Sequence, residues 1–204
     1  MITIIDYGMG NLRSVQKAFE LYCPKVRVSS SANDILAADK IILPGVGAFG
    51  KAMEELKSRK LIAPLKECIK KGTPFLGICL GIQLLFSESE ESGKVKGLGI
   101  LKGKVRRFKE ASGLKIPHMG WNKIRAKDTT GQEAILNEVP DDSYMYFVHS
   151  YYVEPEEKSV VLCETQYGVN FASGIHKDNV YAFQFHPEKS QGIGLKIIKN
   201  FVEL

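Results

Sequence analysis

Residues 75–83 read FLGICLGIQ, an apolar run that enters the pattern G-x-C-x-G and continues with the spacing of a helix. A short apolar run of this kind is typical of a buried strand. A reactive residue between two glycines, where a strand turns sharply into a helix, forms a nucleophile elbow. The glycines allow close backbone packing through the turn. We therefore predict that Cys79 ends a strand, begins a helix and presents its sulfur at the turn.

The predicted place of Cys79 also suits it chemically. The dipole and free N–H groups of a helix N-terminus favour a thiolate over a thiol. A thiolate attacks carbonyl carbon atoms, so the turn predicts a cysteine nucleophile. The alternative is a buried structural cysteine beside glycines that pack a helix closely. The other cysteines, at 23, 68 and 163, lack two flanking glycines after an apolar strand and are interpreted as structural.

A histidine and a glutamate lie two positions apart in residues 183–188, FQFHPE, at the end of another apolar run. Side chains of a strand repeat their facing every two residues, so His186 and Glu188 are expected to point the same way. The carboxylate would orient the imidazole, which would act as the base toward a nucleophile. The alternative is a loop that leads into the last helix. Together with the cysteine turn, the pair predicts a catalytic triad.

Residues 43–48, LPGVGA, place two glycines after a further buried strand. Their backbone N–H groups would be free at the carboxyl edge of the sheet, where open α/β sheets bind ligands. Such donors can stabilise an oxyanion. The alternative is an ordinary glycine turn before a helix.

The remaining histidines are weaker candidates for the base. His149 follows a short strand and could reach the same edge of the sheet, but no carboxylate has a same-face position near it. It is therefore ranked below His186. We interpret His118 and His176 as surface or loop residues.

The order of apolar and amphipathic segments predicts an α/β fold. Strands are expected at residues 2–7, 26–28, 41–43 and 74–78, and helices from a cap at Asn11 to about 21, at 48–56, at 62–70 and from about 80. This alternation implies an open, mostly parallel sheet with helices on both faces. The second half has β-rich runs at 144–148, 159–165, 170–175 and 180–185, then a helix at 193–202, and predicts an additional antiparallel portion. No linker separates the halves, so residues 1–204 are expected to form a single domain.

Composition excludes several other classes of protein. The 204 residues are 44% hydrophobic and 25% charged, which is ordinary for a globular domain. The net charge of +5 is dispersed, and the basic run at 102–109 is interpreted as a solvated strand or loop face, with docking of an acidic partner as the alternative. Its charges do not alternate with aromatic residues in a stacking pattern, which argues against nucleic-acid binding. Without a C-x-x-C pair, a signal peptide or a membrane span, a cytoplasmic protein with reduced thiols is expected.

Taken together, the motifs resemble those of the class I, triad-type glutamine amidotransferases. The resemblance extends through essentially the whole chain, in segments 6–11 (DYGMGN), 43–49 (LPGVGAF), 77–81 (GICLG), 117–122 (PHMGWN), 146–151 (YFVHSY) and 184–190 (QFHPEKS). Within the family, the motifs are most similar to those of the glutaminase subunits of imidazole glycerol phosphate synthases. Segments 44–49 and 117–122 are more specific to those subunits than the cysteine turn or the His-Pro-Glu.

The resemblance implies a flavodoxin-like α/β fold and hydrolysis of L-glutamine to glutamate and ammonia through a thioester intermediate. It implies that Cys79 is the nucleophile, His186 the acid and base, and Glu188 the residue that orients the ring. The implied oxyanion hole contains Val46, Gly47 and Leu80, and the implied glutamine contacts are Gly47, Gln83, His149, Ser150 and Tyr151. Neither a metal nor a cofactor is implied.

The resemblance also implies a partner, a (β/α)8-barrel cyclase that forms a heterodimer with this chain and receives ammonia through a tunnel. The cyclase would make imidazole glycerol phosphate and aminoimidazole carboxamide ribotide in histidine biosynthesis. The chain itself has no phosphate-binding glycine fingerprint and no spare length for an acceptor domain. We expect residues 45–47 to complete the oxyanion hole by a peptide flip only when partner and acceptor are bound.

Three alternatives stay open. The first is a related glutaminase that supplies ammonia to an enzyme modifying surface sugars. The second is a stand-alone γ-glutamyl hydrolase, which would be fully active without a partner. The third is a catalytically silent binding domain, which would be free to lose the triad residues that this chain retains.

Overall fold

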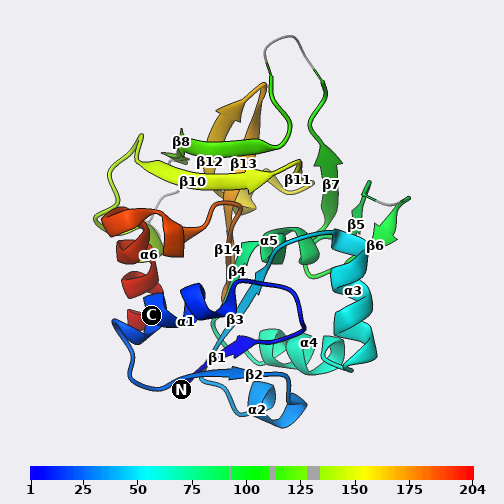
Figure 1. Ribbon diagram of the computed structural model, residues 1–204, viewed down its shortest axis with the longest axis vertical. Helices are drawn as coiled ribbons and strands as arrows, with labels where there is room; N and C mark the ends of the chain where they lie inside the picture. The colour runs from blue at the N-terminus through cyan, green and yellow to red at the C-terminus, as the bar shows by residue number, and fades with distance from the viewer. Residues whose placement is uncertain (92, 111–113, 128–133) are drawn as a thin grey trace.

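The computed structural model describes residues 1–91, 93–110, 114–127 and 134–204, and Figure 1 shows their arrangement. One half of the main sheet is parallel. Its strands are, in spatial order, β2 (Val26–Ser29), β1 (Ile2–Ile5), β3 (Lys40–Gly45), β4 (Phe75–Cys79) and β14 (Val180–Phe183). Every neighbouring pair in this group is parallel, so the carboxyl ends of β3, β4 and β14 meet at one edge.

Helices cover both faces of the parallel half, as predicted. They are α1 (Leu12–Glu20), α2 (Ala32–Leu36), α3 (Phe49–Ser58), α4 (Ile62–Lys70), α5 (Leu80–Leu84) and α6 (Gln191–Glu203). Successive strand side chains point to opposite faces, so Leu43 of β3 enters the core filled by α3 and α4, and Ile42 the core filled by α1 and α6. These helix pairs lie at the right and the left of Figure 1. The side chain of Asn11 caps α1, accepting a hydrogen bond from the Ser14 N–H at 3.4 Å.

The sheet continues past β14 as an antiparallel half. Its strands are β13 (Val169–Lys177), β11 (Tyr151–Pro155), β7 (Gly103–Arg107), β5 (Glu88–Ser89) and β6 (Val95–Lys96), with β12 (Val161–Tyr167) paired to β13 and β9 (Arg125–Ala126) paired to β12. Most of these pairs are antiparallel, as expected for the second half, although β5 and β7 are parallel. Short 3-10 helices occur at η1 (Ala134–Leu136), η2 (Lys158–Val160) and η3 (Pro187–Lys189).

A separate two-stranded ribbon consists of β8 (His118–Lys123) and β10 (Tyr144–His149), paired antiparallel from Tyr144–Lys123 to His149–His118. In Figure 1 it crosses the molecule above the ends of the parallel strands. The Val148 carbonyl oxygen lies 3.9 Å from the Cys79 sulfur, so the ribbon closes over the end of β4.

The predicted strands and helices are present, with ends shifted by a few residues. The chain also forms α2, the ribbon strand β8, strand β11 and the two-residue strands β5, β6 and β9, none of which was predicted. The basic run forms β7 as a solvated face: Lys104 pairs with Glu88, and Arg106 pairs with Glu90 and Glu154. Within the described ranges, no helix is both long and apolar enough to cross a membrane.

Candidate active site

The turn at Cys79 has a backbone conformation that is rare for a residue with a side chain. Its φ is +55° and its ψ is −107°, at the junction of β4 and α5. Such strain persists where the surrounding structure holds it, which is common at functional sites. The flanking glycines are needed for space, because a Cβ on Gly81 would lie 2.0 Å from the Leu43 oxygen and one on Gly77 2.9 Å from the Gly81 carbonyl carbon. The predicted strand–turn–helix geometry is confirmed.

His186 and Glu188 lie just beyond the end of the neighbouring strand, β14. His186 Nδ1 is 2.8 Å from Glu188 Oε1, and both side chains are almost fully buried. The carboxylate accepts this bond, so Nδ1 carries the proton and Nε2 is left as the free nitrogen. Nε2 is buried and has no hydrogen-bond partner among the described residues.

His186 and Glu188 pair as predicted, but the prediction that they lie on one face of a strand was wrong. β14 ends at Phe183, and Glu188 belongs to the 3-10 turn η3, so the two side chains do not share a strand face. Pro187 has no N–H and fits the start of this turn. Hydrogen bonds to β10 hold the turn in place: the His186 N–H donates to the Tyr146 oxygen at 2.9 Å, and the Tyr146 N–H donates to Ser190 Oγ at 3.0 Å.

The electrostatics of His186 connect it to the cysteine. Burial by itself lowers the pKa of His186, but the Cys79 sulfur and the Glu188 carboxylate outweigh burial and raise this pKa above its ordinary value. The surroundings therefore favour a protonated ring between a sulfur and a carboxylate. The thiol proton can therefore pass to the neutral ring, and the protonated ring that results can give it to a leaving group.

A cavity of about 250 Å³ opens beside Cys79. Every residue that the family resemblance assigned to the oxyanion hole or to glutamine contacts lies on its wall. The lining residues are Val46, Gly47, Cys79, Leu80, Gln83, Glu91, Pro117, Val148, His149, Ser150 and Tyr151. Most of its wall comes from three segments far apart in the sequence, namely the end of β3, the elbow with α5, and the β10–β11 connection; Glu91 and Pro117 complete it. The cavity is of a size for a small polar molecule.

The end of β3 lies directly against the elbow. Gly45 pairs with Cys79 in the sheet register, and a Cβ on Gly45 would lie 2.1 Å from the Tyr7 hydroxyl. The following residues, Val46 and Gly47, border the cavity; Gly47 has a φ of +96°, which favours glycine. Backbone from this segment and from Leu80 therefore surrounds the space above the sulfur.

Gln83 and His149 contribute to the wall through bonds within the protein. Gln83 Nε2 donates to the Tyr151 oxygen at 3.1 Å and to Gln184 Oε1 at 3.0 Å, so its own oxygen is the atom left for a ligand. His149 Nδ1 is bonded to the Tyr151 oxygen at 2.8 Å and Nε2 to His118 Nδ1 at 2.9 Å. Since both nitrogens are engaged and burial lowers the pKa of His149 to about 3, His149 is not available as a base.

The sequence interpretation of His118 as a surface or loop residue was wrong. His118 is in β8, has 3% of its surface exposed and stacks on Tyr167 with ring centroids 3.8 Å apart. No local signal marked it: the alternation in residues 118–122 puts His118 and Asn122 on one strand face and the apolar Met119 and Trp121 on the other, a pattern that favours burial of the apolar face.

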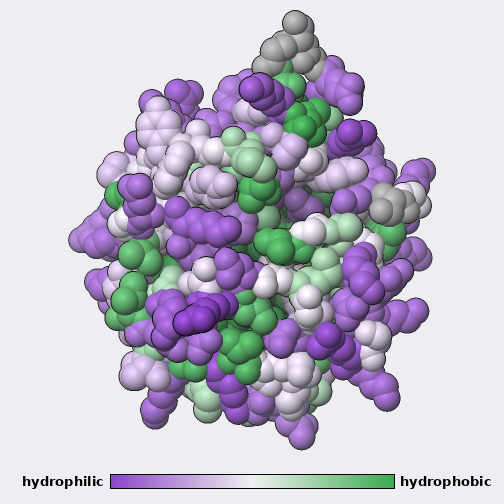
Figure 2. Space-filling view, in the orientation of Figure 1, coloured by the Kyte–Doolittle hydropathy of each residue, from purple (hydrophilic) through white to green (hydrophobic). Residues whose placement is uncertain are grey.

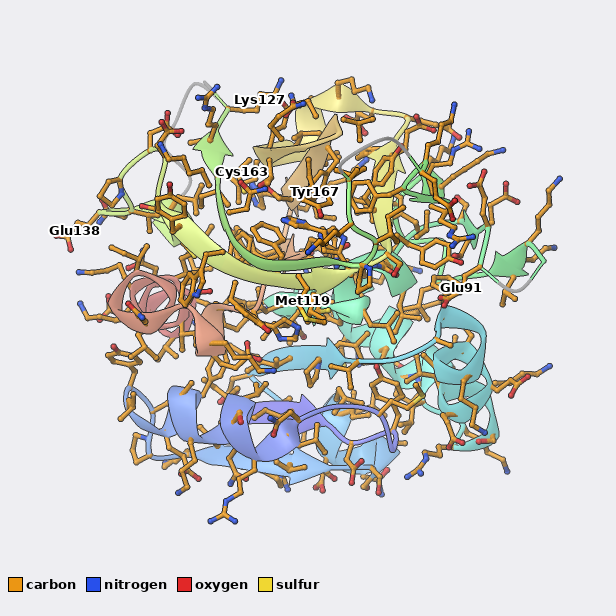
Figure 3. The ribbon with its side chains drawn as sticks, turned by 45° about the horizontal axis from the view of Figure 1, so that its top comes forward. Glu91, Met119, Lys127, Glu138, Cys163 and Tyr167 are labelled. Atoms are coloured by element: carbon orange, nitrogen blue, oxygen red, sulfur yellow. The ribbon has the colours of Figure 1, made fainter. Side chains whose placement is uncertain are left out.

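Three lining residues, Glu91, Pro117 and Val148, were not assigned to the site from the sequence. Glu91 is the carboxylate among the lining residues, and its Oε2 accepts a hydrogen bond from the Phe49 N–H at 2.7 Å, at the first residue of α3. Figure 3 shows Glu91 at this end of α3. It lies in an acidic, serine-rich stretch at residues 87–91, where nothing in the spacing distinguishes one acid from its neighbours.

Residues 3–204 match the family model described as "Glutamine amidotransferase class-I". The chain therefore belongs to the class I glutamine amidotransferases, and it is an enzyme.

Two curated relatives are more specific. The chain is 58% identical to the "Imidazole glycerol phosphate synthase subunit HisH" of Methanocaldococcus jannaschii, over 100% of both chains. It is 53% identical to the protein of the same name from Aquifex aeolicus, over 97% of this chain and 94% of that relative.

Solved structures support the fold at much lower identity. A crystal structure titled as a glutamine amidotransferase has a TM-score of 0.76 at 16% identity and covers 100% of this chain and 98% of its own. The PurLQS structure from Thermotoga maritima has a TM-score of 0.71 at 18% identity, with 99% and 97% covered. These similarities confirm the expected α/β class.

Proposed function

We propose that this chain is the glutaminase subunit of an imidazole glycerol phosphate synthase and that residues 1–204 form its single catalytic domain. One observation carries the catalytic part. His186 offers a buried Nε2 with no bond inside the described chain, while Glu188 holds the opposite nitrogen and Cys79 lies in a strained turn at the cavity. A nucleophile, an oriented base and a small polar cavity suit acyl transfer from a carboxamide.

His186 carries the protons that move in the proposed reaction. The ring takes the proton of the Cys79 thiol as the sulfur bonds to the side-chain carbonyl carbon of glutamine. The resulting oxyanion accepts hydrogen bonds from backbone N–H groups at Val46, Gly47 and Leu80. The C–N bond breaks, His186 returns the proton to the departing ammonia, and a γ-glutamyl thioester remains on Cys79. Water then attacks the thioester, His186 moves one proton from water to the sulfur, and glutamate leaves.

The cavity offers complementary groups for the amino-acid end of glutamine. The Glu91 carboxylate provides a negative charge for the α-ammonium group while its Oε2 stays fixed by the Phe49 N–H. The Gln83 oxygen faces the same space, since its nitrogen is committed elsewhere. Backbone at residues 149–151 provides the facing wall.

A partner surface adjoins the cavity. Met119, Trp121 and Tyr144 of the β8–β10 ribbon are 62%, 46% and 56% exposed, and Val46 beside the cavity is 39% exposed. Figure 2 shows hydrophobic residues across the middle of this face, and Figure 3 labels Met119 at the β8–β10 ribbon. Exposed apolar residues grouped in this way favour a protein partner. We propose that the partner is the (β/α)8-barrel cyclase, which receives the ammonia through a tunnel in the heterodimer.

Partner binding would also explain how glutamine hydrolysis is restrained. Val46 belongs both to the exposed apolar surface and to the predicted oxyanion hole, so a partner that covers it acts on the same peptide. We expect slow turnover by the isolated chain and faster turnover in the complex. Equal rates would refute this restraint. We also place the protein in the cytoplasm, because all four of its cysteines are free and a reducing compartment keeps a nucleophilic thiol.

The decisive experiment is Cys79→Ala in the complex with the cyclase. Glutamine-dependent synthesis of imidazole glycerol phosphate should disappear, while synthesis from added ammonium salt should persist, since the cyclase chemistry lies on the other chain. Cys68→Ala is the matched control and should retain glutamine use. Failure of the wild-type gene to complement a histidine auxotroph that lacks this subunit would contradict the assignment to the histidine pathway.

A further inference from the structure

We propose that Asn122 and His118 are positioning residues of the glutaminase site, which hold the Tyr151 carbonyl and the Gln83 amide through a directed chain of hydrogen bonds. This inference rests on the proposed glutaminase function. Neither residue lines the cavity, so any effect they have on glutamine binding must pass through the chain of hydrogen bonds.

The hydrogen-bond chain consists of short contacts between buried and partly buried groups. Asn122 Nδ2 lies 3.2 Å from His118 Nε2, His118 Nδ1 lies 2.9 Å from His149 Nε2, and His149 Nδ1 lies 2.8 Å from the Tyr151 oxygen. Both imidazole rings are almost fully buried. The chain thus passes from β8 through β10 to the first residue of β11.

Proton positions along the chain follow from its inner end. The Tyr151 carbonyl can only accept, so His149 carries its proton on Nδ1. Burial lowers the pKa of His149 to about 3 and that of His118 to about 4, so both rings are neutral at pH 7. A neutral ring has one N–H, so His149 Nε2 accepts from His118 Nδ1–H, and His118 Nε2 accepts from the Asn122 amide.

The Asn122 end of the hydrogen-bond chain independently fixes the same donor-to-acceptor direction. Asn122 Nδ2 also donates to the Gln166 oxygen at 3.0 Å, and Asn122 Oδ1 accepts from the Lys123 N–H at 2.8 Å. Both contacts require the amide nitrogen to face His118. Every donor in the chain therefore has an acceptor, and the two ends select the same tautomers.

The inner end reaches the reactive groups. The Tyr151 oxygen accepts a second bond from Gln83 Nε2, whose other proton goes to Gln184 Oε1. Gln184 Nε2 in turn lies 4.0 Å from the Cys79 sulfur. Loss of the His118 donor would leave His149 Nε2 buried without a partner, which is costly and frees the ring to turn. The Tyr151 carbonyl, and with it the Gln83 amide in the cavity wall, would then lose its fixed position.

The test compares two replacements of His118 in the complex with the cyclase. His118→Phe keeps a ring to stack on Tyr167 and Phe147 but removes both nitrogen atoms. His118→Asn supplies a single amide donor in place of Nδ1. We expect His118→Phe to raise the KM for glutamine about tenfold, the usual scale for one buried hydrogen bond, and His118→Asn to recover most of this loss. Synthesis from ammonia should stay at the wild-type rate.

Tyr167→Phe is the control, since it changes the same aromatic cluster without removing any member of the chain. It should leave the KM unchanged. If His118→Phe does not fold, Asn122→Leu replaces it, with the same expected direction. The imidazole ¹⁵N spectrum of the wild-type protein should show Nδ1–H tautomers for His118 and His149.

Three results would overturn the inference: an Nε2–H tautomer for either ring, a wild-type KM in the folded His118→Phe or Asn122→Leu protein, or an equal loss in His118→Asn. None of them would affect the glutaminase assignment, which fails only if the wild-type complex does not use glutamine.

Discussion

The parallel and the antiparallel halves of the molecule build the site in different ways. In the parallel half, close backbone contact fixes the nucleophile: Gly77 and Gly81 let α5 begin against β3 and β4 with no room for a Cβ. In the antiparallel half and its ribbon, hydrogen bonds between His118 and His149, and from His149 to the Tyr151 carbonyl oxygen, fix the cavity wall. Substitutions that add volume should therefore be most harmful in the parallel half. The antiparallel half should be more sensitive to the loss of hydrogen-bond donors and to protonation of its histidines.

The largest effect should come from volume in the parallel half. Gly81→Ala would place a methyl group 2.0 Å from the Leu43 oxygen. We expect a loss of about 3 kcal/mol or more in the free energy of unfolding, because backbone atoms cannot yield as a flexible side chain does. Glutaminase activity should be abolished. Urea denaturation measures the first effect, with Gly192→Ala as the control, since a Cβ there meets nothing within 4 Å. Equal stability of the two variants would contradict the packing account.

The second-largest effect is expected where the two halves meet, at the turn that follows β14. Glu188→Gln keeps the shape of the side chain but replaces the carboxylate that holds His186 Nδ1 at 2.8 Å. We expect kcat for glutamine to fall by roughly 100-fold or more, the scale of a misoriented general base. The protein should unfold at nearly the same denaturant concentration as the wild type. A kcat within a factor of two of the wild-type value would remove Glu188 from the mechanism.

A smaller effect is expected at the cavity wall. Glu91→Gln can still accept the Phe49 N–H but carries no charge. We expect the KM for glutamine to rise about tenfold with little change in kcat, since the lost interaction acts on bound substrate and transition state alike. The comparison substrate is a glutamine analogue without the α-amino group, which the variant and the wild type should use equally poorly. If the variant uses the analogue less well than the wild type does, Glu91 does not face the ammonium group.

The last prediction concerns protons and the free energy of unfolding. The pKa of His149 is lowered to about 3 and that of His118 to about 4, so the unfolded chain binds these protons first as the pH falls below about 6.5. The free energy of unfolding should therefore decrease between pH 6.5 and pH 5, by roughly 1–2 kcal/mol for each ring. His186 has the opposite sign: its raised pKa adds stability that is lost as the pH rises through the alkaline range. His118→Asn should reduce the acidic slope; an unchanged slope would contradict burial as the cause.

Sequence patterns predicted the parallel half and its chemistry because the signals there are local. A cysteine between glycines, an apolar strand before it and His-Pro-Glu after another strand each lie within a few residues. The part of the cavity wall formed by Gln83 and residues 149–151 was predicted only through family resemblance. The burial of His118 depends on pairing with β10 and stacking on Tyr167, which no spacing within residues 117–122 specifies. Glu91 directly follows β5, whose place is set by pairing with β7 and not by any spacing within residues 87–91.

Covalent labelling tests the central claim most directly. A diazoketone analogue of glutamine alkylates the thiolate that attacks the substrate, and mass spectrometry of the digested complex locates the adduct. The account predicts one adduct, on Cys79, which excess glutamine prevents and which forms far more slowly in Glu188→Gln. An adduct on Cys23, Cys68 or Cys163 with Cys79 unmodified, in a complex that has lost its use of glutamine, would contradict it.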